Sequence, residues 1–590
     1  MTLLKGILAV MLSAALGAAV LLPLRGAPHV FVGAGDFRPP ASPPRVAGGS
    51  PASPSSGNAA PPGQGHARTP AAGVPANVRV TNDAGGHYLR ADGGTDSVMD
   101  ACGNGRREQN EPTVGVDPHD PRVVVAGAND YCSTVATGET WLGYYRSTDQ
   151  GRTWHDSLVP GYPSDDSAAG RASPTMKLCQ SGSDPSASFD REGRLFYGFI
   201  CFQRVGRFGQ KGFANSSTFV ASYDQDGGHY GRTILVGKGS RSADEDKINL
   251  AVDQTAGPHS GNVYTAWVEL APPAPGGFPQ DLLRFSRSTD HGRTFSKPQP
   301  LSDLHHATNP DIAVGPDGTV FVTFDAGGGI FVARSTDGGK TFEVPSEADT
   351  LAFPLESSDF SGGSGRDCGD GSFKCNTGLT FSRFSSFPTI AADQTGVHVA
   401  WSDRLLSGRN GQSKIYVRTS TDGVSWPGTA VQIDDAPKGH QYYPDLASSN
   451  GTITLVFYDS RNDPAYDPLG PPGETKDGKS PGGAVDTYVA QSRDGGTSWS
   501  ERRVSSLSSN YNLEVPGPVP FWGDYIYVSA VGGTVMVVWT DSRAVVLADH
   551  GTGGADGFDP FEPCFNTRAF ANDPCLSKGG HDQNIYAARI

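Results

Sequence analysis

The chain has 590 residues, which is too long for one ordinary hydrophobic core unless that core is repeated. Its formal net charge is −15, whereas phosphate binding requires a basic face, so we expect no nucleic-acid partner. Glycine (77 residues) and proline (45) are spread between short apolar runs, which is typical of a turn-rich all-β protein.

The first 25 residues have the pattern of an export signal. Lys5 is followed by an almost wholly apolar run from Gly6 to Leu24, which predicts a signal peptide or an N-terminal signal anchor. Residues 26–75 are rich in Pro, Ala, Gly and Ser and hold almost no large apolar side chains, so we expect a disordered linker. The folded part, residues 76–590, is therefore expected to be secreted or extracytoplasmic, with a membrane tether as the alternative.

Eight cysteines are present, and none has the Cys-x-x-Cys spacing of a zinc site. An even number with close neighbours indicates disulfides formed in an oxidising compartment. Eight cysteines allow many connectivities, and pairing between sequence neighbours is our preference. The neighbouring pairs are Cys102/Cys132, Cys179/Cys201, Cys368/Cys375 and Cys564/Cys575.

An eight-residue phrase recurs along the chain. Residues 147–154 read Ser-Thr-Asp-Gln-Gly-Arg-Thr-Trp, and five related copies follow. Its short carboxylate accepts backbone N–H bonds across a tight turn, and its closing aromatic residue points back between sheets. We interpret the phrase as a structural β-hairpin turn and not as a catalytic motif. The aspartates of the six copies are Asp149, Asp224, Asp290, Asp337, Asp422 and Asp494.

A second repeat, x-Pro-x-apolar-Ala, precedes each strand pair. Together the two signals define a unit of four antiparallel strands, and tandem units of this kind close into a β-propeller. Six clear starts and a weaker one at residues 521–529 favour seven blades, with six as the alternative. The last unit lacks a fourth strand after residues 584–588, and residues 78–81 would supply it. The clear starts are Glu111, Asp184, Lys247, Asn309, Phe387 and Tyr443.

These turns resemble the Asp-box (BNR) repeats of the sialidase superfamily, and residues 105–590 resemble its exported bacterial members. The resemblance implies an exo-glycosidase of the exo-alpha-sialidase type that acts on extracellular or cell-surface glycans. Sialidases carry three sugar-binding arginines, a tyrosine nucleophile with a glutamate partner, and an aspartate acid/base. Their first arginine lies in a Phe-Arg-Ile-Pro phrase, which this chain lacks. Asp-box propellers also occur in proteins that hydrolyse nothing, so the alternative is a non-catalytic propeller that binds glycan or protein.

In such a propeller, the starts of first strands and the ends of second strands share the face opposite the Asp-boxes. A glycosidase of this type needs a nucleophile beside a carboxylate, and a carboxylic acid that protonates the leaving oxygen. The nucleophile pair is expected to be Tyr525 with Asp524, or Tyr443 with Glu111 or Glu269. The acid is expected to be Asp130 or Asp246.

Arginines recur at the ends of three successive second strands, each after an aspartate. They form either a ring of guanidinium groups that binds an anionic ligand or Asp–Arg pairs that brace neighbouring blades. A fourth arginine precedes a first strand. The ligand-binding candidates are Arg404, Arg461, Arg543 and Arg383.

The histidines show no metal-binding spacing, so we expect neither a resident metal nor another cofactor. One loop gathers Asp459, Asp463 and Asp467, which either hold Ca²⁺ through oxygen ligands or form a solvated acidic loop. The expected partner is an extracellular glycan or glycoprotein. Membrane contact is expected only through the N-terminal segment, and the chain is expected to be a monomer.

Overall fold

The computed structural model describes residues 73–81, 88–90, 93–95, 109–131, 140–205, 212–240, 243–271, 281–351, 366–367, 374–375, 387–404, 412–466, 468, 472, 484–509, 522–543 and 583–590. The predicted export segment and nearly all of the predicted linker lie outside these residues.

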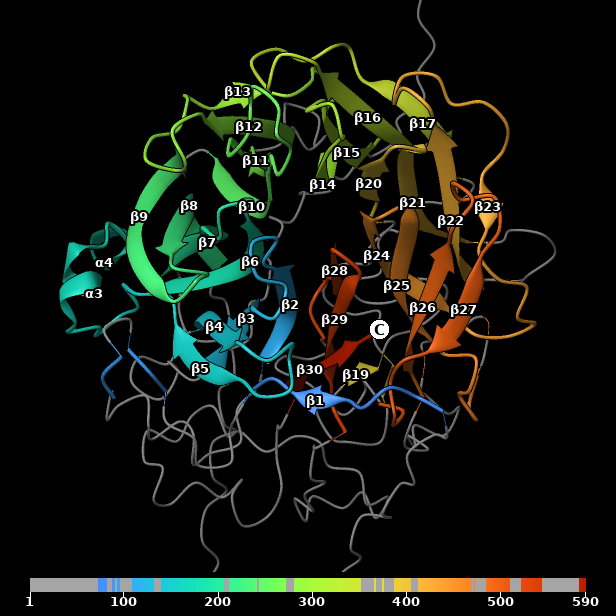
Figure 1. Ribbon diagram of the computed structural model, residues 1–590, viewed down its shortest axis with the longest axis horizontal. Coiled ribbons are helices and arrows are strands. Elements are labelled where there is room, and N and C mark those ends of the chain that lie inside the picture. Colours follow the sequence, from blue (N-terminus) through green and yellow to red (C-terminus); the bar gives the residue numbers. More distant parts are fainter. Residues whose placement is uncertain are drawn as a thin grey trace, which may run out of the picture.

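Seven four-stranded antiparallel sheets surround a central axis (Figure 1). The strands of each sheet follow one another from the axis to the rim, so the first strand of each blade lines the centre (Figure 1). The predicted all-β propeller is confirmed, and so is the preference for seven blades.

The first three blades contain strands β2 to β13. Blade 1 consists of β2 (Gln109–Val116), β3 (Val124–Asp130), β4 (Trp141–Ser147) and β5 (His155–Leu158). Blade 2 consists of β6 (Ser181–Phe189), β7 (Leu195–Val205), β8 (Gly212–Asp224) and β9 (His229–Lys238). Blade 3 consists of β10 (Asp244–Val252), β11 (Val263–Leu270), β12 (Leu282–Ser288) and β13 (Gln299–Pro300).

Blades 4 to 6 have the same order. Blade 4 consists of β14 (Ala307–Val314), β15 (Val320–Ala326), β16 (Gly329–Ser335) and β17 (Ser346–Thr350). Blade 5 consists of β20 (Thr389–Asp393), β21 (Gly396–Arg404), β22 (Ser413–Ser420) and β23 (Val431–Gln432). Blade 6 consists of β24 (Gln441–Ser449), β25 (Thr452–Asp459), β26 (Asp486–Ser492) and β27 (Ser500–Arg503).

Few elements lie outside the blades. Two short helices, α3 (Ala168–Ala172) and α4 (Thr175–Leu178), connect blades 1 and 2. A two-stranded hairpin, β18 (Arg366–Asp367) and β19 (Lys374–Cys375), occurs in the sequence between the last strand of blade 4 and the first strand of blade 5.

Blade 7 is built from both ends of the folded chain. It consists of β28 (Tyr527–Val531), β29 (Thr534–Asp541), β30 (Asn584–Arg589) and the N-terminal strand β1 (Val78–Arg79) (Figure 1). The Val80 N–H donates to the Ile585 carbonyl at 2.8 Å, and the Thr81 hydroxyl donates to Asn584 at 2.9 Å. The predicted closure by residues 78–81 is confirmed.

A separate hydrophobic cluster fills each of the seven junctions between neighbouring blades. The closing aromatic of every predicted Asp-box packs against the cluster between its own blade and the preceding one. The turn therefore fastens a blade to its neighbour as well as joining two strands. These aromatic residues are Trp154, Tyr230, Phe295, Phe342, Trp426 and Trp499.

The hydrogen bonds of the Asp-box are well represented by the turn of blade 4. Asp337 Oδ1 accepts from the Ser335 hydroxyl at 2.8 Å and from the Lys340 and Thr341 N–H groups at 3.0 and 2.9 Å. Its Oδ2 accepts from the Thr341 hydroxyl at 2.7 Å. Burial raises the pKa of Asp337, but the bonds from Thr341 and Ser335 outweigh it and lower the pKa to about 2.

Four further turns hold their aspartate through the same kind of bonds, whereas the turn of blade 2 differs. The copy in blade 2 is one residue longer, and Gln225 and Asp226 both take left-handed backbone angles (φ 55° and 54°). Among the described residues, none donates a hydrogen bond to the Asp224 side chain. The extra residue moves the carboxylate out of reach of the groups it binds elsewhere. The four similar aspartates are Asp149, Asp290, Asp422 and Asp494.

One predicted disulfide is present, between Cys179 and Cys201. It ties the segment after α4 to the second strand of blade 2, and it agrees with folding in an oxidising compartment. Each of the other three predicted pairs includes a cysteine outside the described residues. No helix within the described part has the length and apolar character to cross a bilayer.

Removing residues 1–81 is expected to destabilise the propeller far more than removing residues 1–72. The longer truncation deletes β1 and the buried Val80 side chain, whose burial contributes about 2 kcal/mol on its own. Thermal unfolding of the two truncated proteins measures the difference. Equal melting temperatures would show that β1 does not hold the ring closed.

The two kinds of turn are expected to respond differently to loss of their aspartate. Asp337→Ala should lower the free energy of unfolding by about 1–2 kcal/mol, because four hydrogen bonds are lost. Asp224→Ala should cost less than about 0.5 kcal/mol. Because the folded pKa of Asp337 is lowered, its contribution is present above about pH 4 and is lost as the pH falls toward 2. Urea unfolding at neutral and acidic pH tests both statements, and equal losses for the two variants would contradict them.

Candidate functional site

The antiparallel order of each blade gives the ring two different faces. The Asp-box turns and the connections between first and second strands share one face, which we call the box face. The first strands begin, and the second strands end, on the opposite face, which we call the entry face. Nearly all of the predicted catalytic and ligand-binding residues belong to the entry face by their position in the repeat.

Six residues on the entry face take a left-handed backbone angle at the same position of the repeat. Their φ values lie between 39° and 58°, although none of them is glycine. In five of these blades the pairing of the first two strands shifts register here, which is the mark of a β-bulge. Such angles cost about 1–2 kcal/mol each and are often found at functional sites. The residues are Glu111, Asp184, Lys247, Asn309, Phe387 and Tyr443.

A closed circuit of polar groups connects four blades on this face. Asn129 Nδ2 donates to Glu111 Oε2 (2.5 Å), and the Asp184 N–H donates to Asn129 Oδ1 (3.0 Å). The Lys247 N–H donates to Asp184 Oδ2 (3.1 Å), and Lys247 Nζ pairs with Asp524 Oδ2 (2.7 Å). The Asp524 N–H donates to Glu111 Oε1 (3.1 Å) and closes what we call the acidic circuit.

Gly523 allows the seventh blade to join the acidic circuit. Its φ is 88°, and a Cβ atom there would lie 2.2 Å from Glu111 Cγ and 2.9 Å from the Glu111 backbone nitrogen. Any other residue would push Asp524 away from Glu111. The glycine therefore brings two of the predicted catalytic carboxylates, Glu111 and Asp524, into contact.

The phenol of Tyr525 is buried beside this circuit. Its hydroxyl has no hydrogen-bond partner among the described residues. Burial raises the pKa of Tyr525 well above its usual value, and the negative charges of Glu111, Asp184 and Asp524 raise it further. The phenol is therefore protonated at neutral pH and can donate a hydrogen bond to a ligand, but it is not a ready phenolate nucleophile.

A small depression of about 60 Å³ lies at the axis on the entry face. Among the described residues that line it, Lys247 alone carries a positive charge, and its Nζ lies 5.3 Å from the centre of the Phe387 ring. Asn309 and Tyr525 also line it. The depression thus combines carboxylates, an amide, a phenol and an aromatic ring, the groups that commonly hold sugar hydroxyls.

Two further carboxyl groups on this face have a raised pKa. Burial raises the pKa of Asp325, which accepts a hydrogen bond from Asn309 Nδ2 at 3.0 Å, to about 7. Burial also raises the pKa of Glu245 to about 8, although Trp267 Nε1 donates to it at 2.5 Å. Such groups hold a proton near neutral pH and are candidates for general acids.

Two acidic side chains that line the depression, Asp311 and Asp445, are linked by the hydroxyl of Thr389. The Thr389 hydroxyl lies 2.8 Å from Asp311 Oδ2 and 3.0 Å from Asp445 Oδ1, although it has a single proton to donate. Burial raises the pKa of Asp445 well above its usual value, and the charge of Asp311 raises it further. Asp445 therefore keeps its proton and donates to Thr389, which donates to Asp311.

Of the predicted catalytic residues, Asp130 lies apart from the acidic circuit. It is fully buried and accepts hydrogen bonds from the hydroxyls of Tyr145 (2.6 Å) and Tyr88 (3.0 Å). Successive strand residues point to opposite sides, so Asn129 reaches the circuit while Asp130 points into the blade. Of the alternative residues, Glu269 is held by Arg284 at 2.6 Å, and Tyr443 packs edge-to-face on Phe387.

The predicted arginines of blades 6 and 7 are bound by acidic side chains. Arg461 pairs with Asp459 (2.6 Å) and also with Asp434 of the preceding blade (2.7 Å). Arg543 pairs with Asp541 at 2.6 Å and stacks over Tyr586. This geometry supports the blade-bracing alternative for these two. Arg383 and the side chain of Arg404 lie outside the described part of the structure.

The predicted calcium loop is described only in part. Asp459 is bound to Arg461, and Asp463 Oδ1 accepts from the Ala465 N–H at 2.8 Å, while Asp467 lies outside the described residues. Calcium binding by this loop stays a prediction.

Three members of the acidic circuit are not among the site residues predicted from the sequence. Asp184 and Lys247 are recognised as starts of first strands, at the same repeat position as Glu111, but no role is predicted for them. Asn129 carries no comparable signal, because an amide at a strand end is common. The partners of all three come from other blades or other strands, which a repeat alignment alone does not reveal.

No protein-family model and no curated protein matches this chain. Sialidases recur among the solved structures that are similar to it, as the resemblance of the repeats led us to expect. The intramolecular trans-sialidase of Ruminococcus gnavus is 15% identical with a TM-score of 0.37, covering 61% of this chain and 93% of its own. The Trypanosoma rangeli sialidase is 12% identical (TM-score 0.37), with coverages of 66% and 58%. The GH93 alpha-L-arabinofuranosidase of Fusarium graminearum is 11% identical (TM-score 0.35), with coverages of 59% and 88%. Likeness at this level carries no conclusion about the reaction.

Asp445→Asn is expected to become more stable relative to the wild type as the pH rises. The raised pKa of Asp445 means that its contribution is present below about pH 4 and is lost as the pH rises through the folded-state pKa. The asparagine can still donate to Thr389 and accept from the Val528 N–H, and it cannot ionise. Melting temperatures from about pH 5 to about pH 9 measure the effect.

Asp311→Asn is the matched control. Asp311 accepts four hydrogen bonds, from the Ile390 N–H, the Thr389 hydroxyl, the Ile312 N–H and Asn249 Nδ2. The NH₂ group of an asparagine in its place would point its hydrogens at some of these donors. We expect this variant to melt below the wild type at every pH. Equal behaviour of the two variants would contradict the assigned proton order.

Proposed function

We propose that this protein is a glycoside hydrolase-like propeller whose site is the axial depression of the entry face. The observation that carries the proposal is the acidic circuit, in which three carboxylates and one lysine from four blades meet beside the unpaired phenol of Tyr525. Glycoside hydrolysis needs one protonated carboxyl group and one carboxylate.

The two roles fall to groups of different protonation state. Asp524 forms an ion pair with Lys247 at 2.7 Å, and its carboxylate is proposed to stabilise the positive charge that develops on the sugar ring. Asp325, with a pKa of about 7, is proposed to protonate the leaving oxygen. Tyr525 is proposed to donate a hydrogen bond to a sugar hydroxyl, with Glu111 holding Asp524 in place.

The charge of the site favours a neutral sugar over sialic acid. Glu111, Asp184 and Asp524 are acidic, and the positive charge of Lys247 is already paired. A sugar carboxylate would be repelled there, since Arg461 and Arg543 are bound to acids of the blade edges. The proposed substrate class is therefore an uncharged terminal sugar of an extracellular glycan.

A non-catalytic glycan-binding propeller is the second candidate. It is favoured by the high pKa of Tyr525 and by the hydrogen bonds that already engage the carboxylates of the acidic circuit. Neither the phenol nor these carboxylates is therefore an activated nucleophile. Export to the cell exterior is proposed for either candidate, from the apolar residues 6–24 and the Cys179–Cys201 disulfide.

A panel of fluorogenic glycosides, with neutral sugars and a sialoside, tests the proposal on the secreted chain. We expect turnover of a neutral glycoside, with kcat/KM lowered about 100-fold or more in Asp524→Asn and Asp325→Asn and unchanged in the exposed control Asp435→Asn. Because the acid form of Asp325 is required, activity should fall as the pH rises through about 7.

Each other outcome has a definite meaning. Turnover of the sialoside alone would contradict the neutral-sugar assignment. Glycan binding without turnover, weakened by Tyr525→Phe, would support the second candidate in place of the first. Neither binding nor turnover would contradict both.

A further inference from the structure

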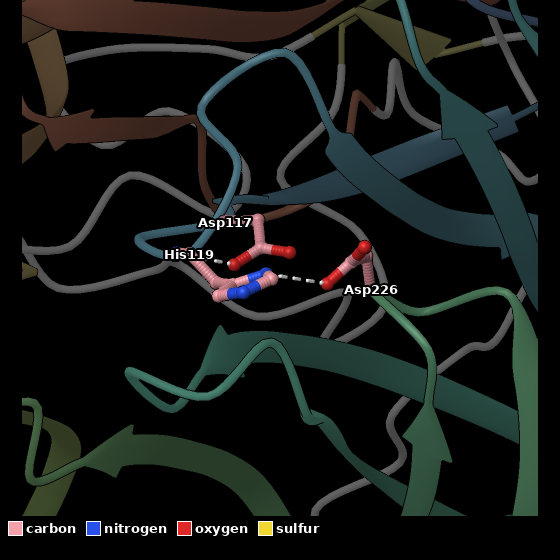
Figure 2. A group of neighbouring side chains, drawn as sticks. All are labelled: Asp117, His119 and Asp226. Atoms are coloured by element: carbon pink, nitrogen blue, oxygen red, sulfur yellow. Dashed lines mark hydrogen bonds and ion pairs between the residues drawn. The ribbon is translucent and has the colours of Figure 1, made fainter.

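A second cluster of ionisable side chains lies on the box face, between blades 1 and 2 (Figure 2). Asp117 and His119 follow β2, and Asp226 lies in the β8–β9 turn of the next blade. One donor atom from each lies within 4.8 Å of the other two. His119 Nδ1 is 3.0 Å from Asp226 Oδ1. The backbone N–H of His119 donates to Asp117 Oδ1 at 2.7 Å.

The second oxygen of Asp117 lacks the partner that a buried carboxylate needs. The Asp117 residue is 0% exposed, and its Oδ2 accepts no hydrogen bond from the described residues. Burial and the nearby charge of Asp226 raise the pKa of Asp117 to about 6. A cation between the two carboxylates would give Asp117 Oδ2 a partner. It would also offset the electrostatic repulsion between Asp117 and Asp226.

At the equivalent position of blade 2, an arginine side chain supplies the positive charge. Asp190 follows β6 as Asp117 follows β2, and its Oδ2 accepts from Arg194 Nε at 2.6 Å. The same guanidinium lies 2.8 Å from Nδ1 of His291, a residue of the next blade's turn. In blade 1 the residue four positions after Asp117 is a proline, so no guanidinium is available from that position.

Blades 3 and 5 also have an aspartate at or directly after the end of the first strand. Asp253 and Asp393 also have a buried Oδ2 without a partner among the described residues. The cluster of three possible ligands, however, is found at Asp117 and not at these two positions within the described chain. An unpartnered oxygen alone is therefore a feature of the repeat, and the convergence with Asp226 and His119 is what distinguishes blade 1.

The turn that supplies Asp226 is also the one in which the side chain of the Asp-box aspartate, Asp224, accepts no hydrogen bond from the described residues. Asp224 accepts none of the bonds that fix Asp337 in blade 4, and the extra residue of this turn presents Asp226 toward blade 1 instead. Blade 1 already holds this turn through Tyr144 and Arg146, which donate to the carbonyls of Gly227 and Asp226 at 2.6 and 2.9 Å. A metal ion here would fasten the blade junction where the aspartate of the turn does not.

We propose that Asp117, His119 and Asp226 bind one divalent transition-metal ion, of the Zn²⁺ class, that bridges blades 1 and 2. Two carboxylate oxygens and one imidazole nitrogen suit such ions, whereas Ca²⁺ prefers six to eight oxygens. The His119 and Asp226 side chains are 60% and 33% exposed, so the ion enters from solvent and keeps water in its remaining positions. The site is separate from the axial depression and does not depend on the proposed function.

Metal content and affinity of the full chain test this site. After EDTA treatment, isothermal titration with Zn²⁺, Mn²⁺ and Ca²⁺ is expected to give one Zn²⁺ per chain and a higher melting temperature with Zn²⁺ bound. His119→Gln and Asp117→Asn should weaken Zn²⁺ binding roughly tenfold or more. His291→Gln, which removes the corresponding histidine of the next junction, should leave affinity unchanged.

The folding of the variants is checked in EDTA. Asp117→Asn keeps the bond from the His119 N–H and can donate toward Asp226, so it should melt no lower than the metal-free wild type. Equal Zn²⁺ affinity in wild type and His119→Gln would overturn the site. Absence of Zn²⁺ binding at millimolar concentration, or binding of Ca²⁺ alone, would overturn it as well.

Discussion

Each blade of this protein depends on its neighbour for the hydrophobic partner that its sheet faces need. The seven apolar clusters lie between blades and not within them, so an isolated blade would expose both of its broad faces. Around the axis, hydrogen bonds reinforce each contact. At six junctions a side chain of one first strand accepts a backbone N–H of the next blade. These acceptors are Thr113, Ser186, Asp311, Thr389, Asp445 and Ser529.

The same geometry explains why polar groups gather at the axis. Seven first strands converge there, and six blades place a residue with a left-handed backbone angle at the same position on the entry face. Hydrogen bonds between blades satisfy most of these groups. Because burial raises the pKa of a carboxyl group at the axis such as Asp445, the protein carries that group in its neutral form. A ring of this kind gives precise relative positions to residues far apart in the chain, such as Glu111 and Asp524.

The blades and their closure could be predicted because their signals are local. A Ser-x-Asp-x-Gly turn and a proline phrase act within a few residues, and their repetition reveals the period. The partners of charged side chains could not be predicted in the same way. Arg461 binds Asp434 and Glu501, which are 27 and 40 residues away, and only the packing of strands brings them together.

Small differences in position also limited the prediction of the site. Asn129 and Asp130 are adjacent at one strand end, and the sequence favoured the acid as the functional residue. The alternation of the strand instead points the amide to the axis and buries the acid against Tyr145. The turn of blade 2 likewise matched the Asp-box in composition, but one additional residue was enough to remove its hydrogen bonds.

The pairing of β1 with β30 has a consequence for biogenesis. Val78 lies opposite Ala587, so nearly the whole length of the chain must be synthesised before the last blade finds its outer strand. Six blades can stack in order as the polypeptide emerges, while the seventh waits for a contact of very long sequence separation. During that interval the faces of the first and sixth blades that will contact the seventh remain open to other chains. Ring closure is therefore the step at which crowding by other chains would expose this protein most to misassembly.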